Sequence, residues 1–176
     1  MIVKLIFCCL LLVSNVSYAY EKCPEELTTC DMTVLGKLEY IWGQNTKDKK
    51  SRLLLNGKEI FKNDSSQIGW VQEGWFFSDN GEMGSMTKFV IYYNLNKPRE
   101  INKDLYLYRA YRVLDFSGKN VVISNEFYPR EVWNIDLDWV SWGKKNAVIV
   151  FEDGSRFRYE KGQVTMIDAG SASQAE

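Results

Sequence analysis

Two aspartates, Asp136 and Asp138, are the residues of this chain whose type and spacing come nearest to a catalytic pair. In a β-strand, residues two apart project from the same face. Two carboxylates on one face can act as acid and base in the hydrolysis of a glycosidic bond. The same alternation fits a strand whose Ile135, Leu137 and Trp139 point inward while both carboxylates are solvated, and we expect this second arrangement.

The chain contains no histidine, which removes several kinds of chemistry. A serine or cysteine nucleophile activated by an imidazole is excluded, and so are zinc sites with histidine ligands. Asp79 and Glu82 lie in a glycine-containing segment that hints at a calcium loop, but the full series of oxygen ligands is missing. We therefore expect a protein without enzymatic activity, metal or cofactor.

The first nineteen residues have the pattern of an export signal. Lys4 precedes a short apolar run at residues 5–13, and small residues, Ser17 and Ala19, occupy the third-last and last positions of the segment. The apolar run is too short to span a bilayer as a permanent helix. We expect residues 1–19 to be a cleaved signal peptide and the protein to be periplasmic or, alternatively, secreted.

Two of the four cysteines, Cys23 and Cys30, lie beyond the expected signal peptide. In an oxidising compartment such a pair commonly forms a disulfide bond, which here would close a small loop. A redox-active pair is the alternative, but the spacing differs from the Cys-x-x-Cys motif of such proteins. We expect a structural disulfide between Cys23 and Cys30.

Beyond the signal, the chain has the pattern of short strands joined by tight turns, without a convincing helical period. Asn-Gly at 56–57, Asp-Gly at 153–154 and Lys-Gly at 161–162 each predict a turn between two strands. We expect residues 20–169 to form one all-β domain of antiparallel sheets. Residues 170–176 are small and polar, and we expect a disordered tail there.

Apolar and β-branched residues indicate where the strands lie. The expected strands cover residues 34–42, 52–55, 59–62, 69–72, 74–77, 88–93, 105–114, 121–123, 147–151, 156–159 and 163–167. Residues 78–87 and 94–103 are rich in glycine, serine or other polar residues and are expected to be loops. The alternation of tyrosines with apolar residues at 105–114 requires a bulge near Arg109 to become regular.

A weak internal repetition connects three parts of the chain. Residues 41–55, 115–123 and 141–150 each pass from an aromatic residue through a glycine-containing turn into an apolar strand. Three such units predict three small antiparallel sheets arranged like the blades of a propeller, which is the small limit of that architecture. The alternative is a single twisted sandwich or barrel of about ten strands.

One short loop is the segment best suited to contact a partner protein. Its residues are Phe116, Ser117, Gly118, Lys119 and Asn120. The aromatic side chain can pack at the base of the loop while the four small and polar residues project, and projecting residues on a rigid scaffold suit entry into a cleft. The alternative is an ordinary hairpin turn.

A second aromatic segment, residues 70–77, can stack on sugars or fill the core, and we expect core positions for most of it.

The export signal, the early cysteine pair, the all-β pattern and the repeated strand–glycine-turn–strand units together resemble a family of periplasmic immunity proteins. These proteins neutralise peptidoglycan-degrading amidase effectors of the type VI secretion system. The resemblance implies a small propeller-like body that inserts a loop into the catalytic groove of the effector, with a serine near the active-site cysteine and histidine. Residues 116–120 would be that loop and Ser117 that serine. The same outline suits a periplasmic lysozyme inhibitor.

Three classes of function follow from these observations. The first is an immunity protein or inhibitor whose partner is an amidase or another cell-wall hydrolase. The second is a carbohydrate- or envelope-binding module that uses tryptophans, and the third is a carboxylate-based glycoside hydrolase. The formal net charge is −1 and no long run of charges of one sign occurs, so we do not expect nucleic acid as a binding partner. We also expect no membrane insertion after the signal peptide is cleaved.

Overall fold

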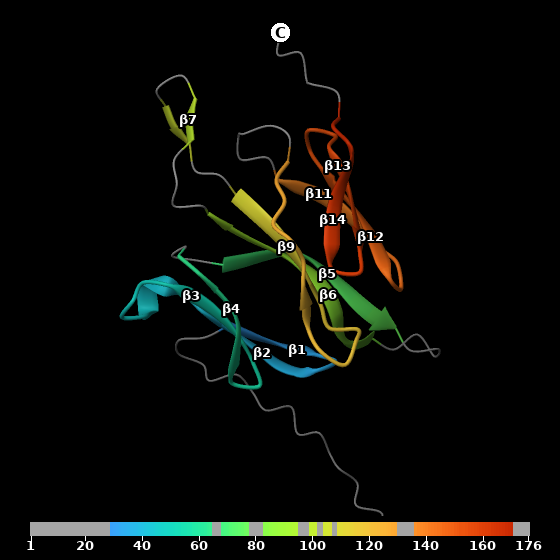
Figure 1. Ribbon diagram of the computed structural model, residues 1–176. Coiled ribbons are helices and arrows are strands. Elements are labelled where there is room, and N and C mark those ends of the chain that lie inside the picture. The colour runs from blue at the N-terminus through green and yellow to red at the C-terminus, as the bar shows by residue number, and fades with distance from the viewer. Residues whose placement is uncertain are drawn as a thin grey trace, which may run out of the picture.

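The computed structural model describes residues 29–64, 68–77, 83–94, 99–101, 104–106, 109–129 and 136–170 (Figure 1). Nearly all regular structure in these ranges is β-strand, with a single 3-10 turn, η1, at Gly43–Asn45. The all-β prediction is confirmed. None of the described residues belongs to a helix that is long and apolar enough to cross a membrane.

The strands belong to two main sheets and one separate hairpin. Eight strands form the large sheet: β1 (Thr29–Thr33), β2 (Gly36–Ile41), β3 (Ser51–Leu55), β4 (Lys58–Asn63), β5 (Ile68–Phe77), β6 (Met83–Asn94), β9 (Arg109–Asp115) and β10 (Val122–Ile123). Four strands form the small sheet: β11 (Leu137–Trp142), β12 (Asn146–Phe151), β13 (Arg156–Glu160) and β14 (Gln163–Asp168). The hairpin consists of β7 (Arg99–Ile101) and β8 (Asp104–Tyr106).

The large sheet is organised around β6 and curls on itself. Its order is β10-β9-β6-β1-β2-β3-β4, and β5 also pairs with β6. The antiparallel pairing of β6 with β9 ends at Lys88, and β1 joins the strand beyond it through a parallel bridge at Met86. The curl brings Phe61 of β4 within 5.5 Å of the Tyr93 ring of β6, measured between ring centroids. Arg112 of β9 lies over the same Phe61 ring, so the two parts of the sheet meet across its concave side.

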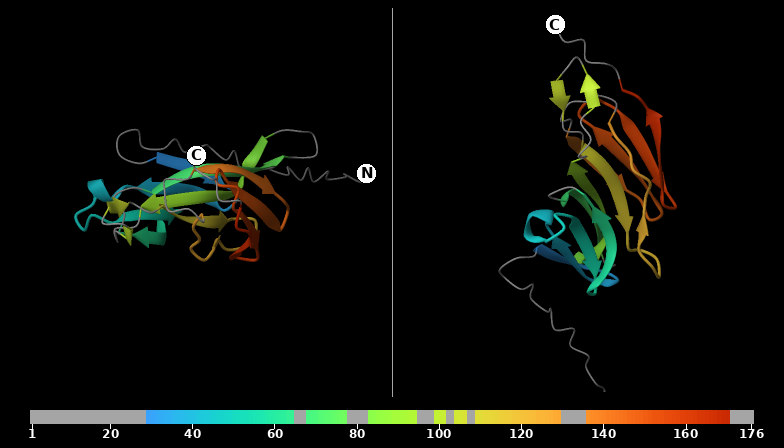
Figure 2. Two further views of the ribbon diagram at one scale, coloured as in Figure 1. Left: turned by 90° about the horizontal axis from the view of Figure 1, so that it is seen from above. Right: turned by 60° about the vertical axis from the view of Figure 1, so that its left-hand side comes forward.

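Strands β6 and β9 contribute to two hydrophobic cores because their side chains alternate between two faces. Phe89 and Ile91 point into the core inside the curled sheet, while Val90 points into a second core between the two sheets. The second core is largely aromatic: the Phe151 ring of the small sheet meets Tyr111 of β9 edge-on at 4.9 Å. Figure 2 shows the small sheet lying beside β9 and β6 as a second layer.

The structure is the barrel- or sandwich-like alternative rather than three separate blades. Residues 41–55 and 115–123, two of the three repeated units, both belong to the large sheet, and only 141–150 lies in the small one. The repetition therefore marks a local strand–turn–strand pattern and not a repeated sheet.

Three predicted strands have different bounds in the structure, because Gly36 closes a turn and Gly74 lies within a strand. The predicted strand at 34–42 begins only at Gly36, whose φ of +121° closes a turn after the unpredicted strand β1. The two predicted strands at 69–72 and 74–77 are one ten-residue strand, β5, in which Gly74 pairs with Lys88 of β6.

The two predicted loops are also partly wrong. Residues 83–87 of the first predicted loop already belong to β6, and residues 99–101 of the second form β7. The predicted buried strand at 121–123 is shorter, and its Val122 is 42% exposed. The hairpin turn at 56–57 is confirmed, with positive φ at both residues.

The contact of Phe151 with Tyr111 tests whether the two layers unfold together. We expect Phe151→Ala to lower the free energy of unfolding by about 3–5 kcal/mol, because the truncation leaves a cavity in the second core. Val34→Ala, at a side chain 45% exposed, is the control and should change it by less than about 0.5 kcal/mol. Urea unfolding followed by circular dichroism and tryptophan fluorescence measures both. Equal effects of the two substitutions, or transitions that differ between probes, would contradict this account.

Candidate functional site

The loop predicted to contact a partner has a buried base and an exposed end. Phe116 is fully buried, and its ring stacks on Phe89 with centroids 5.5 Å apart and planes inclined by 18°. The Phe116 amide donates a hydrogen bond of 2.8 Å to the Thr87 carbonyl, which ties the loop to β6. The four following residues, Ser117, Gly118, Lys119 and Asn120, are all exposed. The loop therefore projects from a fixed aromatic anchor.

Asp115 fixes the first turn of this loop and connects it to the small sheet. Its Oδ1 accepts hydrogen bonds from the Ser117 amide at 2.9 Å and from the Ser117 hydroxyl at 2.5 Å. Its Oδ2 accepts one from the Tyr159 hydroxyl at 2.9 Å. Burial, followed by this hydrogen bond, raises the pKa of Tyr159, so the hydroxyl remains a donor. One carboxylate thus holds both the loop and β13.

Lys88 lies directly across from Asp115 in the β6–β9 register and holds a second turn. Its side chain is 3% exposed. The Lys88 Nζ donates hydrogen bonds to the Gly143 carbonyl at 3.2 Å and to the Lys144 carbonyl at 2.9 Å. A buried ammonium requires such partners, because leaving it unpaired away from water is strongly unfavourable. The turn between β11 and β12 is therefore held against the end of the β6–β9 ladder.

A third turn, between β13 and β14, packs against the same region. Lys161 and Gly162 both have positive φ values, 50° and 82°. A Cβ atom on Gly162 would come within 2.8 Å of the Val122 side chain, so only glycine allows this approach without a shift. Gly162 also contributes a backbone hydrogen bond to Tyr159. The turn therefore lies against Val122, the first residue of β10.

We call residues 116–121, 143–145 and 160–162 the tip. Figures 1 and 2 show these three connections gathered at one end of the small sheet. Sequence reasoning found the first segment but not the other two. A signal was present, because each segment places a lysine next to a glycine, at 118–119, 143–144 and 161–162. These lysine–glycine pairs alone do not predict that the three segments meet, since many turns contain such pairs.

The tip is cationic although the chain has a formal net charge of −1. Its four exposed lysines are Lys119, Lys144, Lys145 and Lys161. The acid among the exposed tip residues is Glu160, 3.8 Å from Lys161. A local excess of positive charge on a fixed surface favours approach of a negatively charged partner.

The structure does not bring Asp136 and Asp138 together as a catalytic pair. Asp136 precedes β11 and forms an ion pair with Arg109, whose guanidinium lies 5.0 Å from the centroid of the Tyr92 ring. The pairing register shifts between Leu137 and Trp139. Trp139 is therefore 44% exposed, and the prediction that its side chain points inward is wrong, because the irregularity breaks the simple alternation.

Several predicted features lie outside the described residues. They are Asp79 and Glu82, the side chains of residues 70–77 and the expected signal peptide. Cys30 lies in β1, but Cys23 falls outside the described residues, so their pairing stays a prediction. Within the described ranges, no group of three or more Cys, Asp or Glu residues could hold a metal ion.

The comparisons with known proteins do not add a family to these observations. The chain matches no protein-family model, and no curated protein is significantly similar to it. The functional argument therefore depends on the geometry of the tip and of the surfaces near it.

Replacing Lys88 tests whether this side chain stabilises the tip. We expect Lys88→Met to lower the free energy of unfolding by about 2–4 kcal/mol, because it removes two charge-assisted hydrogen bonds and leaves two carbonyls unpaired. Lys145→Met, at an exposed position of the same turn, is the matched control, with an expected change below about 0.5 kcal/mol. Chemical denaturation measures both variants. If Lys88→Met lowered the free energy of unfolding by as little as the control does, the Lys88 side chain would not stabilise the tip.

Proposed function

We propose that this protein is a periplasmic inhibitor of the immunity class, which binds a peptidoglycan-degrading effector enzyme and occludes its active site with the tip. The observation that carries the proposal is the exposed segment 117–120, held from below by buried Phe116 and by Asp115. A protruding, braced loop can fill a cleft without supplying any reactive group. The resemblance to amidase-neutralising immunity proteins favours a cell-wall amidase as the partner.

The fixed shape of the loop favours tight binding. Ordering a mobile loop on association consumes part of the free energy of binding, and a loop already held in one conformation avoids that loss. Here the Phe116 ring stack and the Asp115 hydrogen bonds act before any partner arrives. Most of the contact energy is then available for affinity.

Ser117 offers a hydrogen-bond acceptor to the partner. Its hydroxyl proton is donated to Asp115, and because the residue is exposed, its oxygen can still accept a hydrogen bond from a partner. A donor in the partner's groove, such as a protonated imidazole or a backbone amide, would complement this oxygen. This assignment agrees with the role that the resemblance implies for the serine.

The lysines of the tip indicate the charge of the partner surface. Complementary charge around an interface raises association rates and disfavours wrong partners, while it adds less to affinity. An effector with acidic residues around its catalytic groove would therefore be captured faster than a neutral one. The tip would deliver Ser117 to the groove, and its lysines would steer the encounter.

A bulky side chain at Ser117 should block insertion without unfolding the protein. We expect Ser117→Trp to weaken binding of the effector by several kcal/mol, on the order of the loss at an interface hot spot, with an unchanged melting temperature. Asn45→Trp, in the exposed η1 turn, is the matched control and should bind as the unchanged protein does. Calorimetry with the effector co-purified from the periplasm measures both. Unchanged affinity of Ser117→Trp would remove this assignment.

Reversing the charge of the tip should slow association. We expect the combined Lys119→Glu, Lys144→Glu and Lys145→Glu variant to associate with the effector about tenfold or more slowly at low salt, because electrostatic steering is lost. The combined Lys47→Glu, Lys49→Glu and Lys58→Glu variant makes the same change of charge at exposed positions away from the tip. Surface plasmon resonance at several ionic strengths compares them. Equal slowing by both sets would show that overall charge, and not the tip, governs the encounter.

A further inference from the structure

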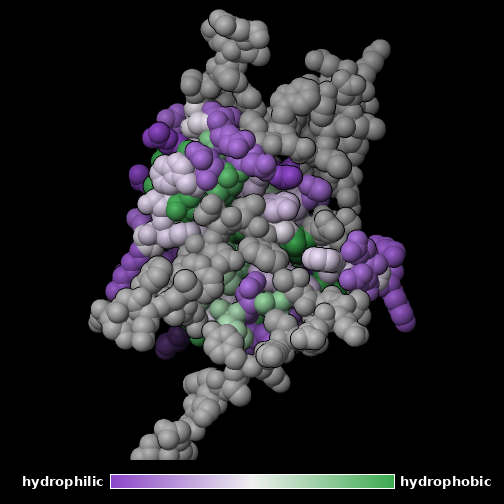
Figure 3. Space-filling model, turned by 180° about the vertical axis from the view of Figure 1, so that it is seen from behind, coloured by the Kyte–Doolittle hydropathy of each residue, from purple (hydrophilic) through white to green (hydrophobic). Residues whose placement is uncertain are grey.

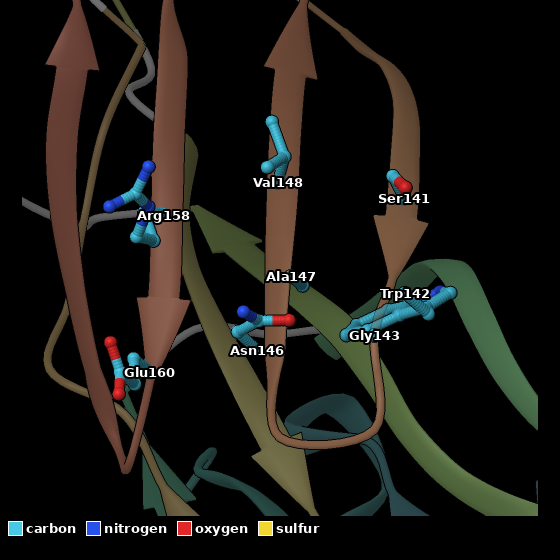
Figure 4. A pocket seen from close by; sticks show the side chains of 8 residues that line it. All are labelled: Ser141, Trp142, Gly143, Asn146, Ala147, Val148, Arg158 and Glu160. Atoms are coloured by element: carbon cyan, nitrogen blue, oxygen red, sulfur yellow. The ribbon is translucent and has the colours of Figure 1, made fainter.

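The face of the small sheet that points away from the large sheet carries a cavity of about 250 Å³. Figure 4 shows Asn146 and Val148 of β12 on its floor, between Arg158 and Glu160 of β13 on one side and Ser141 of β11 on the other. The alternating β12 residues Ala147 and Ile149 point into the second core, so the floor is the outer surface of this layer.

The surface continues from the cavity toward an exposed tryptophan. In the strand register, Val148 lies between Ser141 and Arg158, and Val150 lies between Trp139 and Arg156. The outer face thus has two neighbouring rows, each with an aliphatic residue on β12 and an arginine on β13; Val148 is half-buried, whereas Val150 is only 6% exposed. The register shift that exposes Trp139 also places its indole at the end of this surface. Figure 3 shows, from behind, that hydrophobic and hydrophilic residues are mixed over the described part of that face of the molecule.

The two exposed arginines of β13 differ from Arg52, Arg109 and Arg112. Arg156 and Arg158 are exposed and form no ion pair within the described residues. By contrast, Arg52, Arg109 and Arg112 each pair with a carboxylate. A free guanidinium on a fixed strand is well suited to bind a carboxylate through two parallel hydrogen bonds.

The remaining groups suit the hydroxyl and amide groups of a sugar. Glu160 accepts hydrogen bonds, Asn146 both donates and accepts them, and Ser141 does the same through its hydroxyl. Val148 and the Trp139 indole provide apolar surface for the flat, weakly polar faces of sugar rings. The volume of about 250 Å³ is below the usual range for drug-sized ligands and suits a single ring of a longer chain.

The position on a sheet face disfavours an extended peptide. Peptides that add to sheets gain affinity from main-chain hydrogen bonds at a free edge. Here β12 is paired on both sides, with β11 and with β13, so recognition depends on side chains alone. Side-chain stacking and carboxylate pairing favour a saccharide over a strand-forming ligand.

We propose that the outer face of the small sheet binds a linear saccharide that carries carboxylate groups, with one ring in the cavity and another against Trp139. Arg158 pairs with a carboxylate of the saccharide, and Arg156 is placed to pair with a second one. This surface adjoins the tip at Gly143 and Glu160, which line the cavity, but it does not include the loop 117–120 and does not depend on the inhibitor function. It would hold the protein on an acidic glycan while the loop 117–120 remains free.

Isothermal titration calorimetry of the exported protein with a tetrasaccharide of alternating N-acetylglucosamine and N-acetylmuramic acid tests this site. We expect measurable binding, and binding about tenfold weaker for the neutral tetramer of N-acetylglucosamine, which lacks the carboxylates. Arg158→Gln and Trp139→Ala should each weaken binding of the acidic tetrasaccharide about tenfold. Lys58→Gln removes one exposed charge from β4 and is the matched control, with unchanged affinity.

Nuclear magnetic resonance of the unchanged protein locates the saccharide without relying on variants. Shifts of backbone amides at 139–142, 146–150 and 156–160 are expected, without shifts at 117–120. Ser117→Trp should leave these shifts in place, so a failure of the inhibitor proposal is distinguishable from a failure here. Absence of binding, equal affinity for the neutral tetramer, shifts centred on 117–120, or tighter binding of hexaglutamate than of the acidic tetrasaccharide would each overturn the proposal.

Discussion

A buried ammonium group, that of Lys88, fixes one turn of the tip and lies in register opposite Asp115, whose carboxylate fixes the neighbouring loop. It lies between the two sheets, opposite Asp115, at the point where β9 leaves β6. A charge in such a place is stable only with hydrogen-bond partners, since removing one partner from a buried charge typically costs several kcal/mol. The carbonyls of Gly143 and Lys144 supply them. The position of a turn in the small sheet is therefore set by a residue of the large sheet.

The layered fold makes this arrangement rigid. Strands β6 and β9 present one face to the core of the curled sheet and the other to the aromatic core below the small sheet. Phe116 is anchored in the first core, and Tyr159, which bonds Asp115, lies in the second. Both cores thus contribute to one tip. The outer face of the small sheet remains available for a different ligand.

Local signals in the sequence predicted local structure well. Asn56 and Gly57 predicted their hairpin, and the loop predicted for residues 116–120 has its aromatic residue buried and its other four exposed. The predictions are wrong where pairing with a strand that is distant in the sequence determines the local structure. Gly74 lies within a long strand because β6 pairs with it, and Trp139 is exposed because the register against β12 shifts. The anchoring of the 143–145 turn by Lys88 depends on contacts 55 and 56 residues apart, which no short motif encodes.

Hydrogen–deuterium exchange in the unchanged protein and in the Lys88→Met variant tests most directly whether the buried cation holds its turn of the tip. The informative amide is that of Gly143, in the turn whose carbonyls Lys88 bonds, with Thr46, the residue that follows η1, as a distant reference. The account predicts faster exchange at Gly143 in the variant and no change at Thr46. Equal rates at Gly143 in both proteins, or an equal increase at Thr46, would contradict it.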